Sequence, residues 1–149
     1  MALVFNLAKG LIANGEIDLL NDTIKVMLVG STYTANANQD YVNPSAYQME
    51  LDGTGYAGGY GGSGRKTLAS KTIVEDDTNA RAEFNAAPVT WTSINAGTAA
   101  AAVIIRERAS TGDTMSELIG YVDTGGFPIV TNGGDFTVTW SVEGILQLT

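Results

Sequence analysis

A chain of 149 residues with a formal net charge of −8 contains neither histidine nor cysteine. This double absence excludes catalysis by a histidine base or a thiol nucleophile, disulfide bonds, and zinc sites built on those ligands. The acidic surface disfavours binding to a phosphate backbone, because Lys and Arg together number only 8 against 16 Asp and Glu.

The first 15 residues are predicted to form a short N-terminal arm with a helical turn. Met1–Leu7 is apolar, but it has no preceding basic region and no small-residue cleavage site, so we expect no signal peptide. Ala8–Asn14 suits one or two helical turns, and Gly15 suits their left-handed end. No stretch approaches the ~18 apolar residues of a membrane helix, so we expect no membrane partner and synthesis in a cytoplasm.

Alternating and β-branched segments predict strands along the rest of the chain. These segments are Glu16–Leu20, Thr23–Val29, Arg65–Glu75, Arg81–Asn85, Val89–Ile94, Ala99–Glu107, Glu117–Asp123, Asp135–Val142 and Ile145–Thr149. Ala99–Glu107 is long enough for a helix, but its run of Val103, Ile104 and Ile105 favours a buried strand. Glu143-Gly144 is predicted to form a bulge before the last strand.

This pattern predicts an all-β fold of one domain over residues 1–149. Seven to nine short strands separated by Gly, Asn and Asp turns are typical of an antiparallel β-sandwich, and we expect a jelly-roll-like one. Another sandwich topology and a partly open barrel remain alternatives, because strand order cannot be deduced from the pattern.

Residues 30–64 are predicted to form a long loop region rich in Gly, Asn and Tyr, mostly at the surface, with a short strand near Tyr47–Leu51. Within it, Gly53–Gly58 matches G-x-G-x-x-G, but no strand-to-helix context surrounds it, so a dinucleotide site is not expected. Gly59–Thr67 approaches a P-loop, yet Arg65 stands where lysine should follow the last glycine. We interpret the segment as an interface loop.

Acidic and aromatic residues offer weaker candidates for chemistry. The turn Glu75–Asn79 gathers oxygen atoms that could hold Ca²⁺, but it lacks EF-hand spacing, and an acidic turn is usually only solvated. No pair of carboxylates stands out as a glycosidase pair. Trp91 and Trp140 lie on apolar faces of their strands, which favours core packing over sugar stacking. We therefore predict that the protein is not an enzyme and assign no catalytic, cofactor or metal residue.

Five segments together resemble a family of small virion structural proteins of tailed bacteriophages. The matching segments are Glu16–Leu28, Gly53–Thr72, Asp76–Trp91, Leu118–Asp123 and Asp135–Leu148. The resemblance is one of pattern over nearly the whole chain, and it implies no catalytic residues. It implies instead a virion component assembled in the host bacterial cytoplasm, as a cement or decoration protein on the head.

The subunit interface is predicted at the arm and at the Gly/Tyr loop Gly53–Gly64, because their apolar and aromatic residues have no evident place in the core. The side chains assigned to this interface are Leu3, Val4, Phe5, Tyr56, Tyr60 and Arg65. The expected partners are the major capsid protein or other virion subunits, and further copies of the chain in a homo-oligomer. Nucleic acid and small-molecule substrates are not expected, and the negative charge favours the outer capsid surface.

Two other functions remain open at this point. A tail-tube or neck component would assemble into rings rather than bind the capsid lattice. A carbohydrate-binding virion accessory would need Tyr60 or Trp140 exposed in a groove with carboxylates. Burial of both tryptophans would instead favour a cement protein.

Overall fold

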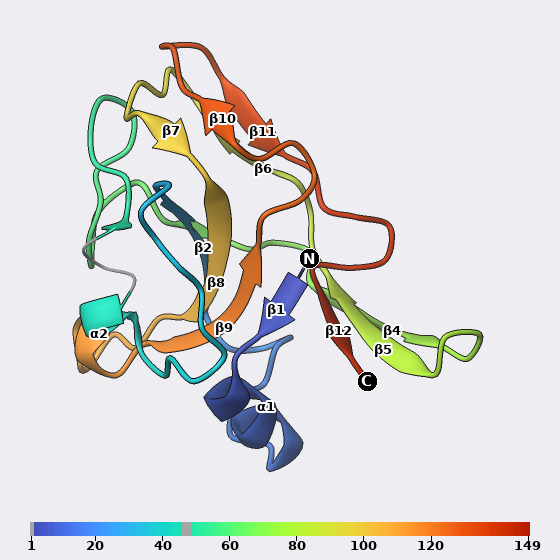
Figure 1. The fold of residues 1–149 in the computed structure, drawn as a ribbon. Coiled ribbons are helices and arrows are strands. Elements are labelled where there is room, and N and C mark those ends of the chain that lie inside the picture. Colours follow the sequence, from blue (N-terminus) through green and yellow to red (C-terminus); the bar gives the residue numbers. More distant parts are fainter. Residues whose placement is uncertain (1, 46–48) are drawn as a thin grey trace.

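The computed structural model describes residues 2–45 and 49–149 and consists mainly of antiparallel strands (Figure 1), which confirms the all-β prediction. The strands are β1 (Ala2–Val4), β2 (Ile24–Val29), β3 (Lys66–Thr67), β4 (Thr72–Asp76), β5 (Arg81–Asn85), β6 (Val89–Trp91), β7 (Thr98–Ala99), β8 (Ala101–Arg106), β9 (Glu117–Val122), β10 (Ile129–Val130), β11 (Phe136–Val138) and β12 (Leu146–Leu148). The helical elements are α1 (Asn6–Ala13), α2 (Val42–Ser45) and the 3-10 turn η2 (Gly112–Thr114).

A five-stranded antiparallel sheet forms the centre of the molecule, in the order β1-β9-β8-β2-β3. Strand β8 pairs with β2 along its full length, with Val103 opposite Met27 and Ile104 opposite Val26. All six residues of β8 are buried, because both faces of the central sheet are covered. A strand covered on both faces needs a continuous apolar run, which explains the sequence of β8 and confirms its assignment as a strand rather than a helix.

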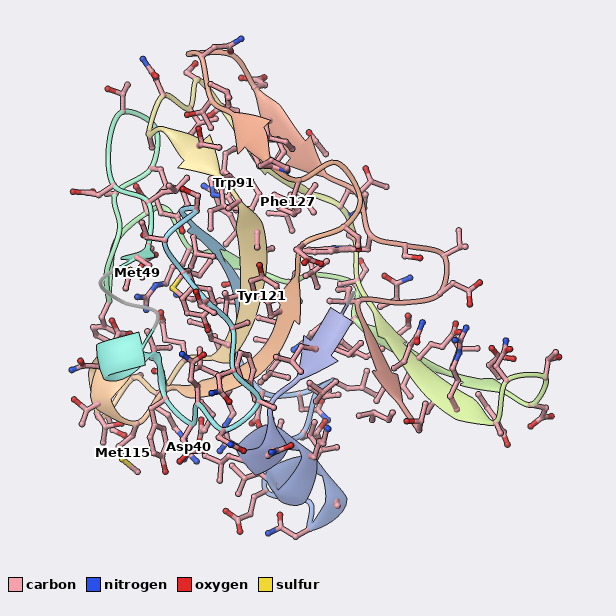
Figure 2. All side chains as sticks on the ribbon, in the orientation of Figure 1. Asp40, Met49, Trp91, Met115, Tyr121 and Phe127 are labelled. Atoms are coloured by element: carbon pink, nitrogen blue, oxygen red, sulfur yellow. The ribbon has the colours of Figure 1, made fainter. Side chains whose placement is uncertain are left out.

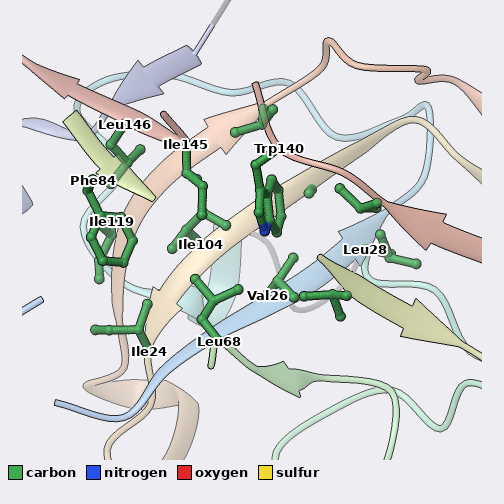
Figure 3. Close-up of a cluster of buried hydrophobic side chains, with 14 of the residues drawn as sticks. Ile24, Val26, Leu28, Leu68, Phe84, Ile104, Ile119, Trp140, Ile145 and Leu146 are labelled. Carbon is green, nitrogen blue, oxygen red and sulfur yellow. The ribbon is translucent and has the colours of Figure 1, made fainter. Parts of the chain in front are cut away.

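The smaller sheets cover one face of the central sheet. They are a three-stranded sheet, β12-β5-β4, and two ribbons, β11-β6 and β10-β7. Figure 3 shows the core between the layers, where Val26 and Ile104 of the central sheet face Trp140 and Leu146. Trp91 and Phe127 lie in the upper part of the molecule (Figure 2), and Trp91 stacks on Phe136 with ring centroids 5.5 Å apart.

The opposite face of the central sheet is covered by the chain that follows β2. Tyr33 and Val42 are buried there against Met27 and Val103. Most described residues of 30–64 are exposed or half-buried, as expected, but a few apolar side chains of this segment fill the sheet face. An apolar sheet face must be covered by something, and here a loop without long strands or helices supplies the covering side chains.

Three strand predictions differ from the structure in informative ways. Glu16–Leu20 is not a strand, because Asp18 accepts hydrogen bonds from the backbone N–H of Leu20 and Asn21 and turns the chain. Arg65–Glu75 is divided into β3 and β4, since Ser70 adopts a left-handed φ of 51°. In place of the bulge predicted at Glu143-Gly144 the chain makes a turn. Of the predicted strand Tyr47–Leu51, Tyr47 and Gln48 lie outside the described residues, and among the other three only Glu50 forms an isolated β-bridge, with Val29.

The N-terminal arm is part of the fold. Strand β1 pairs with β9, so that Leu3 lies opposite Tyr121 and Val4 opposite Gly120. Helix α1 follows directly, and Gly15 ends the segment with a φ of 78°, as its glycine predicts. The jelly-roll strand order stays a prediction, since the strands form one large sheet and three smaller ones.

Candidate interaction surface

The predicted interface residues of the arm have their places inside the chain. Val4 and Phe5 are buried, and the Phe5 N–H donates to the Ile119 carbonyl at 3.1 Å. Leu3 is half-buried and packs near Tyr121. The premise of the interface prediction, that these residues have no place in the core, is therefore wrong. Strand β1 pairs with β9, which lies far from it in the sequence, and no local sequence pattern reveals such a pairing.

The two tyrosines of the Gly/Tyr loop differ from each other. Tyr56 is buried, and its hydroxyl accepts from the Leu28 N–H at 2.9 Å and donates to Glu50 at 3.1 Å. Burial, followed by the nearby charge of Glu50, raises the pKa of Tyr56 well above its ordinary value. Tyr60 is 45% exposed, and its hydroxyl donates to the Ala109 carbonyl at 2.9 Å. Of the two tyrosines, only Tyr60 has a ring that is exposed enough to contact another molecule.

The glycines of the motif Gly53–Gly58 allow the chain to form a tight turn. Gly53 and Tyr56 exchange backbone hydrogen bonds of 2.8 and 3.0 Å, so the chain reverses within the motif. Gly55 has a φ of 75°, and a Cβ there would lie 2.6 Å from the Ser93 carbonyl oxygen. These glycines are required by backbone packing. The described chain after them continues into turns and β3, so no helix follows the motif directly.

Arg65 lies at the centre of a buried group of charges, which we call the Arg65 cluster. Its guanidinium is held between two carboxylates: Nη2 is 2.7 Å from Glu50 Oε2, and Nη1 is 2.6 Å from Asp113 Oδ1. Burial alone lowers the pKa of Arg65, but the hydrogen bonds to Glu50 and Asp113 overcome it and raise the pKa above its ordinary value. Arg65 was predicted at an interface, and the structure instead buries it in ion pairs within the chain.

Glu107 completes the Arg65 cluster. Its Oε1 accepts from Lys25 Nζ at 2.5 Å. Its Oε2 is buried, accepts no hydrogen bond from the described residues, and lies 3.9 Å from Arg65 Nη1. The cluster therefore links strand β2 and the loops around residues 50, 65, 107 and 113, and it fixes the loop that covers the central sheet.

A second buried cluster is formed by Glu117 and two arginines. Arg106 Nη2 and Arg108 Nη2 donate to Glu117 Oε1 at 2.6 and 2.7 Å, and Arg106 also bonds to Asp22 at 3.0 Å. Burial acts to raise the pKa of Glu117, but the hydrogen bonds from Arg106 and Arg108 outweigh it and lower the pKa below its ordinary value. Such pairs leave neither the arginines nor the carboxylate free for acid–base chemistry.

The acidic turn Glu75–Asn79, considered above for Ca²⁺, contributes one residue, Asp76, to a group of carboxylates that surround an arginine. Oxygen atoms of Asp76, Glu83 and Glu143 lie within 4.8 Å of one another. Arg81 contacts all three, at 3.2 Å from Asp76, 2.7 Å from Glu83, and in direct contact with Glu143. We call this group the Arg81 cluster. Its guanidinium supplies the positive charge that a bound cation would otherwise supply.

Both tryptophans are buried, as predicted. Trp91 donates from Nε1 to the Gly64 carbonyl at 2.6 Å, and Trp140 donates to the Ala87 carbonyl at 3.0 Å. Trp140 lines a surface groove together with Glu143, but only 8% of its surface is exposed. A sugar-stacking platform needs an open aromatic face, and the packing of Trp140 withholds it.

Two neighbouring apolar residues are exposed on the hairpin β4–β5, which extends away from the body (Figure 1). Ile73 is 44% exposed and Val74 is 56% exposed. Ile73 borders a shallow groove whose apolar lining includes Ile12, Leu20 and Leu148. We call these four residues the hairpin groove. This groove is not predicted from the sequence, because the predicted strand Arg65–Glu75 is assigned no solvent-exposed face.

No family model, curated protein or solved structure matches this chain. The described helices are also too short to cross a membrane. The interpretation of the molecule therefore depends on its own geometry and on the sequence pattern.

Proposed function

We propose that this chain is a structural protein of a tailed-bacteriophage virion that binds the outer surface of the capsid as a cement or decoration protein. The observation that carries the proposal is which described side chains are paired within the chain and which are exposed. Most of the arginines form ion pairs within the chain, whereas aliphatic side chains are exposed on a projecting hairpin. This arrangement suits protein binding and offers no evident catalytic group.

The charge of the chain supports an outer location. A net charge of −8 repels packaged DNA, and the positive charges of the two buried clusters are already neutralised by carboxylates. Burial of Trp91 and Trp140 also favours cement over sugar binding. The proposed partner is the major capsid protein.

The proposed mechanism is passive stabilisation. A subunit that binds the assembled shell and not its dissociated parts stabilises the shell by mass action. Interfaces of about 800 Å² per partner, repeated over many copies, would add up across the lattice. Shells that lack the protein are therefore expected to rupture at a lower temperature.

The test is to mix the purified protein with empty capsids and with isolated tails, and to image both by electron microscopy. Regular added density on the capsid lattice, together with a higher rupture temperature, is the expected result. Binding to tails or formation of free rings would support the tail-tube or neck alternative. Binding to neither particle would overturn the proposal and favour the carbohydrate-binding alternative.

A further inference from the structure

Strand β4 is a free edge of the three-stranded sheet β12-β5-β4. Among the described strands its one neighbour is β5, and four of its five residues are exposed. An antiparallel edge strand directs every other backbone N–H and C=O outward, where they can pair with another chain. Because the hairpin extends away from the body (Figure 1), a second strand could approach this edge.

Charges of opposite sign flank the exposed Ile73 at equal spacing. Lys71 stands two residues before Ile73, and Glu75 stands two residues after it. Residues two apart on a strand share one face, so Ile73 and Glu75 of β4 lie on the same side of the hairpin, and Lys71 directly precedes the strand. Lys71 Nζ donates to the Asp22 carbonyl at 2.5 Å, and an ammonium group keeps two further donors for another partner.

We propose that this edge binds a second copy of the chain by antiparallel pairing of β4 with β4, on a two-fold axis that passes beside Ile73. The two Ile73 side chains would then lie opposite each other. Lys71 of each copy would lie opposite Glu75 of the other copy. The two three-stranded sheets would join into one sheet of six strands.

Charge complementarity selects this register over its neighbours. A two-fold axis beside Val74 would place Ile73 opposite Glu75, and an axis beside Glu75 would place the two Glu75 carboxylates opposite each other. Apolar pairs and opposite charges stabilise directly opposed positions, whereas like charges destabilise them.

The proposal is independent of the virion role, because the dimer would form in solution without other virion proteins. Sedimentation equilibrium of the full chain over a concentration series measures it. Lys71→Glu or Glu75→Lys places like charges opposite each other at two related positions, and each is expected to weaken the homodimer about tenfold or more. An equimolar mixture of the two variants pairs opposite charges again and is expected to recover the association. Lys66→Glu on β3 is the matched control and leaves the dimer unchanged.

Cross-linking tests the register in a chain that has no cysteine of its own. Directly opposed residues of an antiparallel pair have Cα atoms about 4.5–5.5 Å apart, which suits a disulfide. Ile73→Cys is expected to form disulfide dimers under mild oxidation much faster than Val130→Cys, which replaces a more exposed residue elsewhere. A chain that stays monomeric at every concentration would overturn the proposal. So would equal cross-linking rates, or a variant mixture that associates no better than its components.

Discussion

The Arg65 and Arg81 clusters have similar composition but different surroundings. Each places one arginine among three carboxylates. In the first cluster Arg65 and Glu50 are 1% and 2% exposed, and loops cover them. In the second, Arg81 and Asp76 flank the turn at the tip of the projecting hairpin and are 13% and 20% exposed, and Glu143 is 53% exposed. The residue types in an ion-pair cluster therefore do not determine how much the cluster contributes to folding stability. That contribution depends on how completely water is excluded.

This difference has a physical basis. Removing one member of a buried pair leaves an unpaired charge in a poorly hydrated site, whereas water and salt screen the remaining charges of an exposed pair. The Arg65 cluster also joins separate loops, so its loss would release the covering of the central sheet. The Arg81 cluster joins one hairpin to the neighbouring turn. The predictions below test this comparison, from the largest expected effect to the smallest.

Arg65→Met is expected to be the most destabilising change. It would leave Glu50 and Asp113 buried without their partner and lower the free energy of unfolding by about 3–5 kcal/mol. Urea unfolding followed by tryptophan fluorescence measures the effect. If Arg65→Met lowered the free energy of unfolding no more than the replacement of an exposed arginine does, burial would not explain a difference in stability between the two clusters.

Acid is expected to destabilise the chain through Glu117. Its pKa is lower in the folded chain than its ordinary value, because Arg106 and Arg108 outweigh the effect of burial. A lowered folded-state pKa contributes stability above the ordinary pKa, and this contribution is lost as the pH falls through the lowered value. The unfolding midpoint should therefore fall as the pH drops below the ordinary pKa of glutamic acid. Glu117→Gln should show a smaller fall, and an equal fall in both proteins would contradict the assignment.

Gly64→Ala is expected to disturb the support of the Arg65 cluster. An added Cβ would overlap the ring of Tyr56, whose hydroxyl bonds to Glu50. Overpacking of this kind costs about 1–3 kcal/mol. Gly10→Ala is the matched control, because a Cβ meets open space there and alanine favours the helix. Thermal unfolding compares the two variants, and a loss equal to that of the control would show that the turn can shift at little cost.

Arg81→Met is expected to have the smallest effect. The exposed cluster keeps access to water, so its carboxylates can be hydrated when the guanidinium is removed. The shift in the urea midpoint should be much smaller than that of Arg65→Met. The midpoint shift caused by Arg81→Met should also be smaller at high salt, because salt screens the repulsion among the remaining carboxylates. A midpoint shift as large as that of Arg65→Met would show that the hairpin cluster is as structural as the buried one.

The parts of the fold that follow local periodicity could be predicted from the sequence. Strands β2, β5 and β9 were predicted to within a residue, because their alternation or apolar content is a local signal. The break at Ser70 could not be predicted, since a left-handed φ is uncommon for serine and has no local sequence signal there. Alternation in Glu16–Leu20 has another cause, because a loop buries Ile17 and Leu19 there.

The candidate site was less predictable than the fold. Arg65 is separated from Glu50 by 15 residues and from Asp113 by 48, and no local pattern reveals such partners. Apolar content alone also misplaced the interface at Val4 and Phe5, which the sheet buries. Exposed apolar residues instead include Ile73 and Val74, a β-branched pair on the edge strand β4. Edge position is a property of sheet order, which one sequence does not provide.

The turn at the end of the hairpin has a practical consequence. Residues 77–80 connect β4 to β5 at a tip that extends away from the body (Figure 1), and Asp77, Thr78, Asn79 and Ala80 are exposed. Exposed tips of this kind accept inserted sequence with little effect on folding. A short foreign peptide placed between Asp77 and Thr78 would extend outward from the tip, which makes this hairpin a natural carrier for displayed epitopes.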